Sequence, residues 1–180
     1  MRDKDPFTAR LALTALVAIA MLFCAAVPSR ARVGARPPSF TLPAVPGGPT
    51  HGRFRISDHL GHKPVVILFW ATWCAPCRQE LPFYQRLVER HGDRLVVVAI
   101  SMDGANAIAS AGAMARRLGV RFPVLSDLDT RVTSRLNPRR SAPFSIWVDA
   151  RGRIVQENEG FTLGEREALS RGINRLVSAR

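Results

Sequence analysis

Two cysteines, Cys74 and Cys77, flank an Ala-Pro dipeptide in the segment FWATWCAPCRQELP. Thiols at this spacing can form a redox couple, supply two ligands of a metal site, or close a structural disulfide. A structural zinc site normally needs four ligands, and the chain has only one other cysteine and four histidines distant from the pair. A purely structural bridge over so short a loop would constrain the unfolded chain little. The spacing therefore favours a redox-active dithiol.

The residues around the pair predict a strand, a helix and a second strand. The continuous apolar runs PVVILFW (64–70) and RLVVVAIS (94–101) are typical of strands that are buried on both faces. Between them, residues 76–90 carry apolar side chains at helical spacing. Such a β-α-β unit predicts two parallel strands joined by a right-handed crossover. Cys74 would then follow the first strand, and Cys77 would lie in the first turn of the helix.

This position at a helix N-terminus indicates which cysteine reacts first. Unpaired backbone N–H groups and the helix dipole favour a thiolate there, and the thiol pKa in such motifs falls to roughly 3.5–7.5. We therefore expect Cys74 to be the nucleophile and Cys77 to resolve the mixed disulfide. Pro76 suits the start of the helix, because it has no backbone N–H to leave unpaired and its φ is already helical.

The rest of the chain alternates between strand and helix patterns, separated by turn residues. The expected elements are a β-hairpin over 40–57, a helix over 105–118, a short strand over 122–125, a short helical stretch after Asp129, an antiparallel hairpin formed by 144–149 and 153–160, and a C-terminal helix with a Thr162–Glu165 capping box. This order predicts one domain of the α/β class.

The N-terminal segment predicts the compartment. Basic residues precede an uncharged apolar run, 11–27, and small residues follow it, which is the pattern of an export segment. The length of the run is intermediate between a signal peptide and the shortest membrane-spanning helix. We expect 1–32 to be a signal peptide or an N-terminal membrane anchor, and 33–180 to be a periplasmic or otherwise extracytoplasmic domain, soluble or anchored by 11–27. Cys24 is expected to be an ordinary residue of the apolar run.

The formal net charge of +12 raises the possibility of a nucleic-acid partner. However, the arginines that supply most of this charge are scattered along the chain. No basic stretch interleaved with aromatic residues resembles a surface on which bases stack. The sequence therefore predicts a basic protein that does not bind nucleic acid.

The segment around the cysteines resembles the active site of thioredoxin-fold proteins. It is most similar to the exported, often membrane-tethered TlpA/ResA/CcmG-type thiol-disulfide oxidoreductases of the broader AhpC/TSA-Redoxin group. The similarity extends to PPSFTLP, ISDHLGHKPVVILFWATWCAPC, GVRFPVLSD and APFSIWVDARGRI. It implies a thioredoxin-like fold, with a central mixed β-sheet flanked by helices and an extra N-terminal β-hairpin.

The resemblance also implies a function. It predicts a reductase of particular protein disulfides, possible roles in cytochrome c or cytochrome oxidase maturation, and a membrane electron donor of unknown identity. It implies no cofactor and no metal. Pro143 would be a cis-proline that faces the dithiol and leaves the Ala142 backbone free to bind a substrate chain, the alternative being an ordinary trans proline at the start of a strand. Trp73 would cover the dithiol from solvent, the alternative being a packing role alone.

Three positions bear on departures from the family pattern. Leu68 stands where cytoplasmic thioredoxins place a buried aspartate that assists proton transfer. Asp103 is a candidate to accept the proton of Cys77 in its place, the alternative being an exposed helix-cap aspartate. Phe144 follows Pro143 where relatives usually carry Thr or Ser, so we expect an apolar surface beside the site.

Other functions of related folds require residues that this chain lacks. A peroxiredoxin-like peroxidase would place a threonine three residues before its reactive cysteine, where this chain has Ala71. A copper-delivery protein of the Sco type would need a downstream histidine, and no histidine follows His91. A redox-inert domain would not require the intact Cys-Ala-Pro-Cys motif. The sequence therefore favours a thiol-disulfide oxidoreductase.

Overall fold

The computed structural model describes residues 32–179. The expected signal peptide or anchor, apart from Arg32, lies outside this range, and so does Cys24. Between residues 32 and 179, no helix has both the length and the apolar character needed to cross a membrane.

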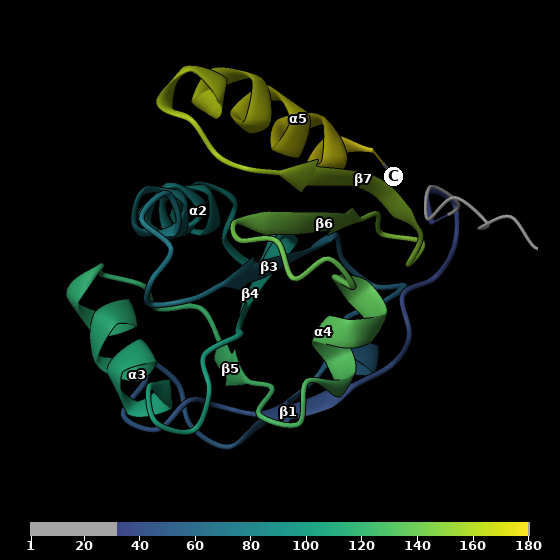
Figure 1. Ribbon diagram of the computed structural model, residues 1–180. Helices are drawn as coiled ribbons and strands as arrows, with labels where there is room; N and C mark the ends of the chain where they lie inside the picture. The colour runs from purple at the N-terminus through teal and green to yellow at the C-terminus, as the bar shows by residue number, and fades with distance from the viewer. Residues whose placement is uncertain (1–31, 180) are drawn as a thin grey trace, which may run out of the picture. The chain divides into compact units, whose positions relative to one another are not determined.

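A mixed five-stranded sheet in the order β5-β4-β3-β6-β7 forms the centre of the described residues (Figure 1). Its strands are β3 (Val65–Trp70), β4 (Val96–Ser101), β5 (Val124–Ser126), β6 (Phe144–Val148) and β7 (Ile154–Glu159). β3, β4 and β5 run parallel, whereas β6 is antiparallel to β3 and β7 is antiparallel to β6. The predicted β-α-β unit and the predicted hairpin are both confirmed.

Helices cover both faces of this sheet (Figure 1). They are α2 (Cys77–His91), α3 (Ile108–Arg117), α4 (Arg131–Leu136) and α5 (Arg166–Ser178), with short 3₁₀ turns η1 (Ile56–Asp58), η2 (Gly92–Arg94) and η3 (Leu163–Glu165). Successive side chains of β3 point to opposite faces. Leu68 and Trp70 pack in a core with α2, α3 and α5, whereas Ile67 and Phe69 pack in a second core with α4 and the N-terminal strands.

The expected N-terminal hairpin is present as β1 (Thr41–Pro43) and β2 (Arg53–Arg55), which pair antiparallel. It continues into the edge of the central sheet, where Ala44 pairs with Leu125 and the Val45 N–H donates to the Val124 carbonyl at 2.9 Å. The hairpin therefore covers the edge strand β5, whose backbone would otherwise be open to another chain.

Element boundaries differ from the predictions by a few residues. The helix expected over 105–118 begins only at Ile108, because Gly104 to Ala107 form a hydrogen-bonded turn. The Thr162–Glu165 capping box is present as expected, but it caps the 3₁₀ turn η3 that leads into α5.

Helix α3 approaches the loop of Pro46 to Gly48 closely at Gly112. A Cβ at Gly112 would overlap the Pro46 carbonyl oxygen and would lie 2.9 Å from the Gly48 backbone nitrogen. Only a glycine allows the backbones of helix and loop to pack at this separation.

The described chain begins beside the start of β7. The Gly34 N–H donates to the Ile154 carbonyl at 2.7 Å, and the Ile154 N–H donates to the Ala35 carbonyl at 2.8 Å. Through the β6 and β7 pairing, Ile154 is in register with Val65, the first residue of β3. β3 has five residue steps between its two ends, which is about 17 Å along the strand. The attachment therefore lies at the end of the strands opposite the carboxyl end of β3.

Candidate active site

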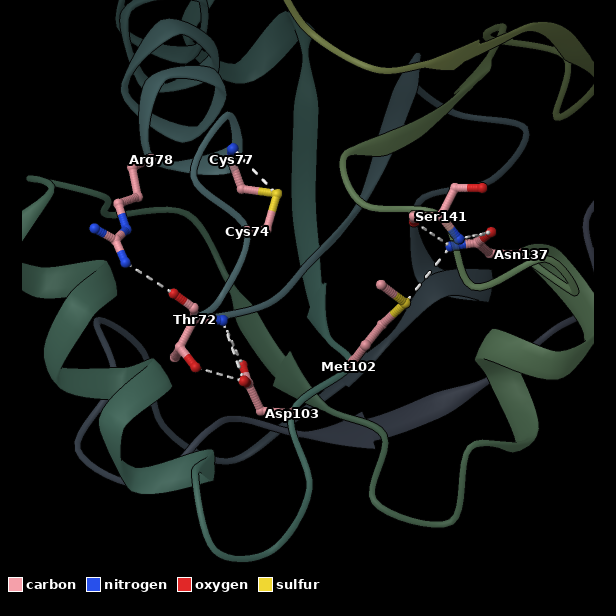
Figure 2. Close-up of a disulfide and its surroundings, with 8 residues drawn as sticks. All are labelled: Thr72, Cys74, Cys77, Arg78, Met102, Asp103, Asn137 and Ser141. Carbon is pink, nitrogen blue, oxygen red and sulfur yellow. Dashed lines mark hydrogen bonds between the residues drawn. A yellow bond between two sulfur atoms is a disulfide. The ribbon is translucent and has the colours of Figure 1, made fainter.

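Cys74 and Cys77 lie where the carboxyl end of β3 meets the start of α2 (Figure 2). They form a disulfide with an S–S distance of 1.96 Å and a Cα–Cα distance of 5.4 Å. Pro76 is the N-cap residue of α2, with φ −63° and ψ −29°, which agrees with its expected place at the helix start. Cys77 is the first residue of the helix, so the predicted strand-to-helix setting of the pair is confirmed.

The helix N-terminus is directed at the Cys74 sulfur. The Cys77 N–H donates to Cys74 Sγ at 3.2 Å (Figure 2). Cys74 is 3% exposed, whereas Cys77 has no exposed surface. After reduction, the helical N–H groups would stabilise a negative charge on Cys74, and only Cys74 offers any surface to a partner.

The surroundings of the dithiol are mainly apolar. Both cysteines belong to a buried cluster that includes Leu68, Trp70 and Leu81. Leu68, which stands where cytoplasmic thioredoxins carry an aspartate, is fully buried in this cluster. Because its side chain is apolar, this position supplies no ionisable group to the dithiol.

Glu80 is an ionisable residue of this region that sequence reasoning missed. It lies one helical turn after Cys77, is 2% exposed, and its Oε2 has no hydrogen-bond partner among residues 32–179. Removal from water raises the pKa of the Glu80 carboxyl from 4.5 to about 8. The signal was available in the sequence, because Cys77, Glu80 and Tyr84 recur at helical spacing on one face.

Tyr84 extends the polar part of this otherwise apolar region. It is fully buried, and its hydroxyl accepts a hydrogen bond from Trp147 Nε1 at 3.1 Å. Burial, together with the charge of Glu80, raises the pKa of the Tyr84 hydroxyl above its ordinary value. Tyr84 therefore stays neutral and anchors α2 to β6.

Asp103 supports the segment that precedes the dithiol. Its carboxylate accepts hydrogen bonds from Thr72 N at 3.0 and 3.1 Å and from Thr72 Oγ1 at 2.6 Å (Figure 2). It also accepts one from Ser101 Oγ at 2.8 Å. Asp103 is 4% exposed, and α3 begins only at Ile108, so the exposed helix-cap interpretation is wrong. In the part of the chain that the structure describes, its carboxylate makes no hydrogen bond to either cysteine.

The segment before β6 lies beside the loop that carries the cysteines. The Ala142–Pro143 peptide bond is cis, which is the geometry implied by the resemblance. Phe144 pairs with Phe69 across the sheet, so Pro143 lies opposite the end of β3. Ala142 packs against the buried cluster that contains both cysteines.

Two side chains near the site differ in exposure. Trp73, which was expected to cover the dithiol, keeps 66% of its surface exposed. Phe144 was expected to offer an apolar surface, and this expectation is wrong. Phe144 is 7% exposed and packs in the second core, with its ring centroid 6.0 Å from that of Phe69. Trp73 is therefore the exposed apolar residue next to Cys74.

Within residues 32–179, no group of three or more His, Cys, Asp or Glu side chains is placed so that it could hold a metal ion.

Comparisons with known proteins agree with the geometry of this site. The AhpC/TSA family profile matches residues 33–159. Thioredoxin-like protein YneN of Bacillus subtilis is 36% identical over 135 residues, which are 74% of this chain and 75% of YneN. Thiol-disulfide oxidoreductase ResA of Oceanobacillus iheyensis is 30% identical over 132 residues, which are 72% of this chain and 66% of that ResA.

A solved structure matches the fold. It is a Chlorobium tepidum protein provisionally assigned as the thiol:disulfide interchange protein DsbE. Its TM-score is 0.70 at 28% identity, and the match covers 81% of this chain and 97% of that protein. The similarity confirms the predicted thioredoxin-like fold.

Proposed function

Because this chain belongs to the AhpC/TSA family and is a thiol-disulfide oxidoreductase, we propose that it reduces disulfides of particular proteins outside the cytoplasm. The observation that carries this proposal is the contact between the Cys77 N–H and Cys74 Sγ at the start of α2. In the reduced protein, the same N–H donor would stabilise a thiolate at Cys74, with the Cys77 thiol behind it on the same turn.

The reaction begins with the reduced dithiol. The Cys74 thiolate attacks one sulfur of the substrate disulfide, which forms a mixed disulfide and releases the other substrate sulfur as a thiolate. Cys77 loses its proton and attacks Cys74 Sγ, which closes the Cys74–Cys77 disulfide and releases the second substrate thiol. Two electrons thus pass from the dithiol to the substrate disulfide.

Glu80 is the group that we assign to accept the Cys77 proton. Cys77 and Glu80 are three residues apart on α2, which places them as neighbours on one helix face. Burial raises the pKa of the Glu80 carboxyl to about 8, close to the ordinary pKa of a thiol, so a proton can move between them at little cost. Asp103, whose carboxylate is engaged by Thr72 and Ser101, serves instead to hold the segment before Cys74.

The substrate chain binds beside Cys74. We assign its contacts to the backbone of Ala142, next to Pro143, and to the exposed ring of Trp73. An extended chain can pair with free backbone groups of such a segment by adding a short strand.

The cellular setting follows from the N-terminal export pattern and from the family. The domain acts in the periplasm or another extracytoplasmic space, soluble or tethered by residues 11–27. Because that space is oxidising, the dithiol must be reduced again by a membrane donor of two electrons. The setting that the family resemblance implies is cytochrome c or cytochrome oxidase maturation.

Reduction of insulin disulfides by the purified full chain tests the catalytic assignment. We expect the wild type to accelerate the reaction, the Cys74→Ser variant to be inactive, and the Cys77→Ser variant to accumulate a mixed disulfide. Equal activity of wild type and Cys74→Ser would contradict the mechanism.

The direction of the reaction is tested separately, by equilibrating the Cys74–Cys77 pair with a dithiol buffer. A reductase is expected to have a potential near that of thioredoxin, about −270 mV. A value near that of strong oxidants, about −120 mV, would refute the reductase direction.

A further inference from the structure

The segment that leads into β6 is fixed at two residues and leaves the residue between them unpaired. Asn137 Oδ1 accepts a hydrogen bond from the Ser141 N–H at 3.1 Å, and Asn137 Nδ2 donates to the Ser141 carbonyl at 2.8 Å. Two residues later, the Pro143 carbonyl accepts a hydrogen bond from the Gly160 N–H at 2.9 Å. Between these anchors, the N–H and C=O of Ala142 have no hydrogen-bond partner within residues 32–179.

One side-chain amide therefore pairs with both backbone groups of Ser141, much as a neighbouring strand would. The bond from Asn137 Nδ2 to the Ser141 carbonyl has a direct effect on Ala142. The Ser141 carbonyl and the Ala142 N–H belong to the same planar trans peptide unit, in which the two groups point in opposite directions. By holding the Ser141 carbonyl, Asn137 Nδ2 also fixes the direction of the Ala142 N–H.

Asn137 is itself held rigidly. Its side chain is buried at 2% exposure, its backbone N–H donates to the Thr133 carbonyl at 2.7 Å, and its carbonyl accepts from the Arg140 N–H at 2.8 Å. Asn137 Nδ2 also contacts Met102 Sδ at 3.5 Å (Figure 2). These contacts fix the amide plane, so the orientation of Ser141 is determined by the end of α4 and by Met102.

Met102 connects this anchor to the loop that carries the nucleophile. The Met102 N–H donates to the Trp70 carbonyl at the end of β3 at 2.9 Å. The next residue, Asp103, binds the backbone and hydroxyl of Thr72, two residues before Cys74. Figure 2 shows the contact of Met102 with Asn137 and the contacts of Asp103 with Thr72 on the segment that follows β4. The same segment thus supports the loop with Cys74 on one side and Asn137 on the other.

From these contacts we infer that Asn137 is a positioning residue, which holds the Ala142 N–H at a fixed place relative to Cys74 so that it can capture the backbone of a disulfide-containing protein. The inference rests on the proposed function, since it assumes that the substrate chain docks at Ala142. Asn137 is assigned no contact with the cysteine sulfurs or with the substrate. It acts by reducing the conformational freedom that binding would otherwise have to remove.

The test compares a protein disulfide with a small one. For Asn137→Ala, we expect the KM for insulin to rise roughly five- to thirty-fold, the effect of one or two lost hydrogen bonds, with kcat changed less than about twofold. The rate with 5,5′-dithiobis(2-nitrobenzoate) and the reduction potential of the dithiol should stay at wild-type values, because neither uses the Ala142 backbone. Asn106→Ala, which removes the same side chain from an exposed loop position, is the matched control.

Asn137→Asp is the second variant, in case Asn137→Ala does not fold. It keeps the acceptor for the Ser141 N–H but places an oxygen where Nδ2 donates to the Ser141 carbonyl. The KM for insulin should again rise, without a change in the reaction with the small disulfide.

Three results would overturn the inference. These are an unchanged KM in a folded variant, an equal loss of rate with insulin and with the small disulfide, and failure of both variants to fold, which would make Asn137 a folding residue. Failure of the proposed function has a different signature, namely wild-type insulin reduction that does not depend on Cys74, and the inference would then fall with it.

Discussion

Replacing Glu80 by glutamine should remove a pH dependence of stability that the buried carboxyl imposes. The pKa of Glu80 is about 8 in the folded protein, because burial disfavours the charged form, and its ordinary value is 4.5. Between these values the unfolded chain has lost a proton that the folded protein keeps. The free energy of unfolding therefore falls by about 1.4 kcal/mol for each pH unit, or about 5 kcal/mol in all. The contribution of the protonated Glu80 carboxyl to the free energy of unfolding is fully present below pH 4.5 and is lost as the pH rises through 8.

Urea unfolding of the oxidised protein at pH 5 to 8.5 measures this effect, because the disulfide-bonded cysteines do not titrate. Glu80→Gln has nearly the same shape and no charge, so all other titrations should cancel between the two proteins. The stability of wild type relative to Glu80→Gln should fall by about 4 kcal/mol across this range. Stability curves that stay parallel within about 1 kcal/mol would refute the assignment of a buried carboxyl with a raised pKa.

Two further substitutions test packing and support of the site. Gly112→Ala should destabilise the protein by about 3 kcal/mol in urea unfolding, because the added methyl group would overlap the backbone of the facing loop. Gly164→Ala is the control, because a methyl group there meets open space. Equal unfolding midpoints for the two variants would contradict the close approach at Gly112. Asp103→Ala should slow the alkylation of Cys74 by iodoacetamide several-fold at pH 7, because the segment before the nucleophile loses its anchor. Exposed Asp93→Ala is the control, and an unchanged alkylation rate in Asp103→Ala would show that this anchor does not affect the thiolate.

The architecture around the dithiol could be predicted because its signals are local. The run that forms β3 is apolar throughout, and the run that forms β4 is apolar up to its last residue, Ser101, so strands buried on both faces fit them best. Pro76 and the helical spacing after it located the start of α2 to within one residue. The redox interpretation of Cys74 and Cys77 needed only this placement.

The errors concern single side chains whose surroundings come from distant parts of the chain. Phe144 belongs to a strand that is buried on both faces, so its sequence pattern does not indicate where each side chain points. Asp103 is buried because Thr72, 31 residues earlier in the sequence, offers it two donors, and no local pattern reports such a partner. Glu80 differs, because its spacing from Cys77 was visible and only its charge suggested an exposed position.

The backbone pairing of Gly34 and Ala35 with Ile154 has a practical consequence for handling the molecule. Residues 34 and 35 lie at the end of the strands opposite the dithiol, about 17 Å away along the strand direction. A dye, an affinity handle or a solid support joined ahead of Arg32 would therefore be attached far from the reacting sulfurs. The protein could be immobilised through this end for flow experiments while a large disulfide-containing protein still reaches Cys74.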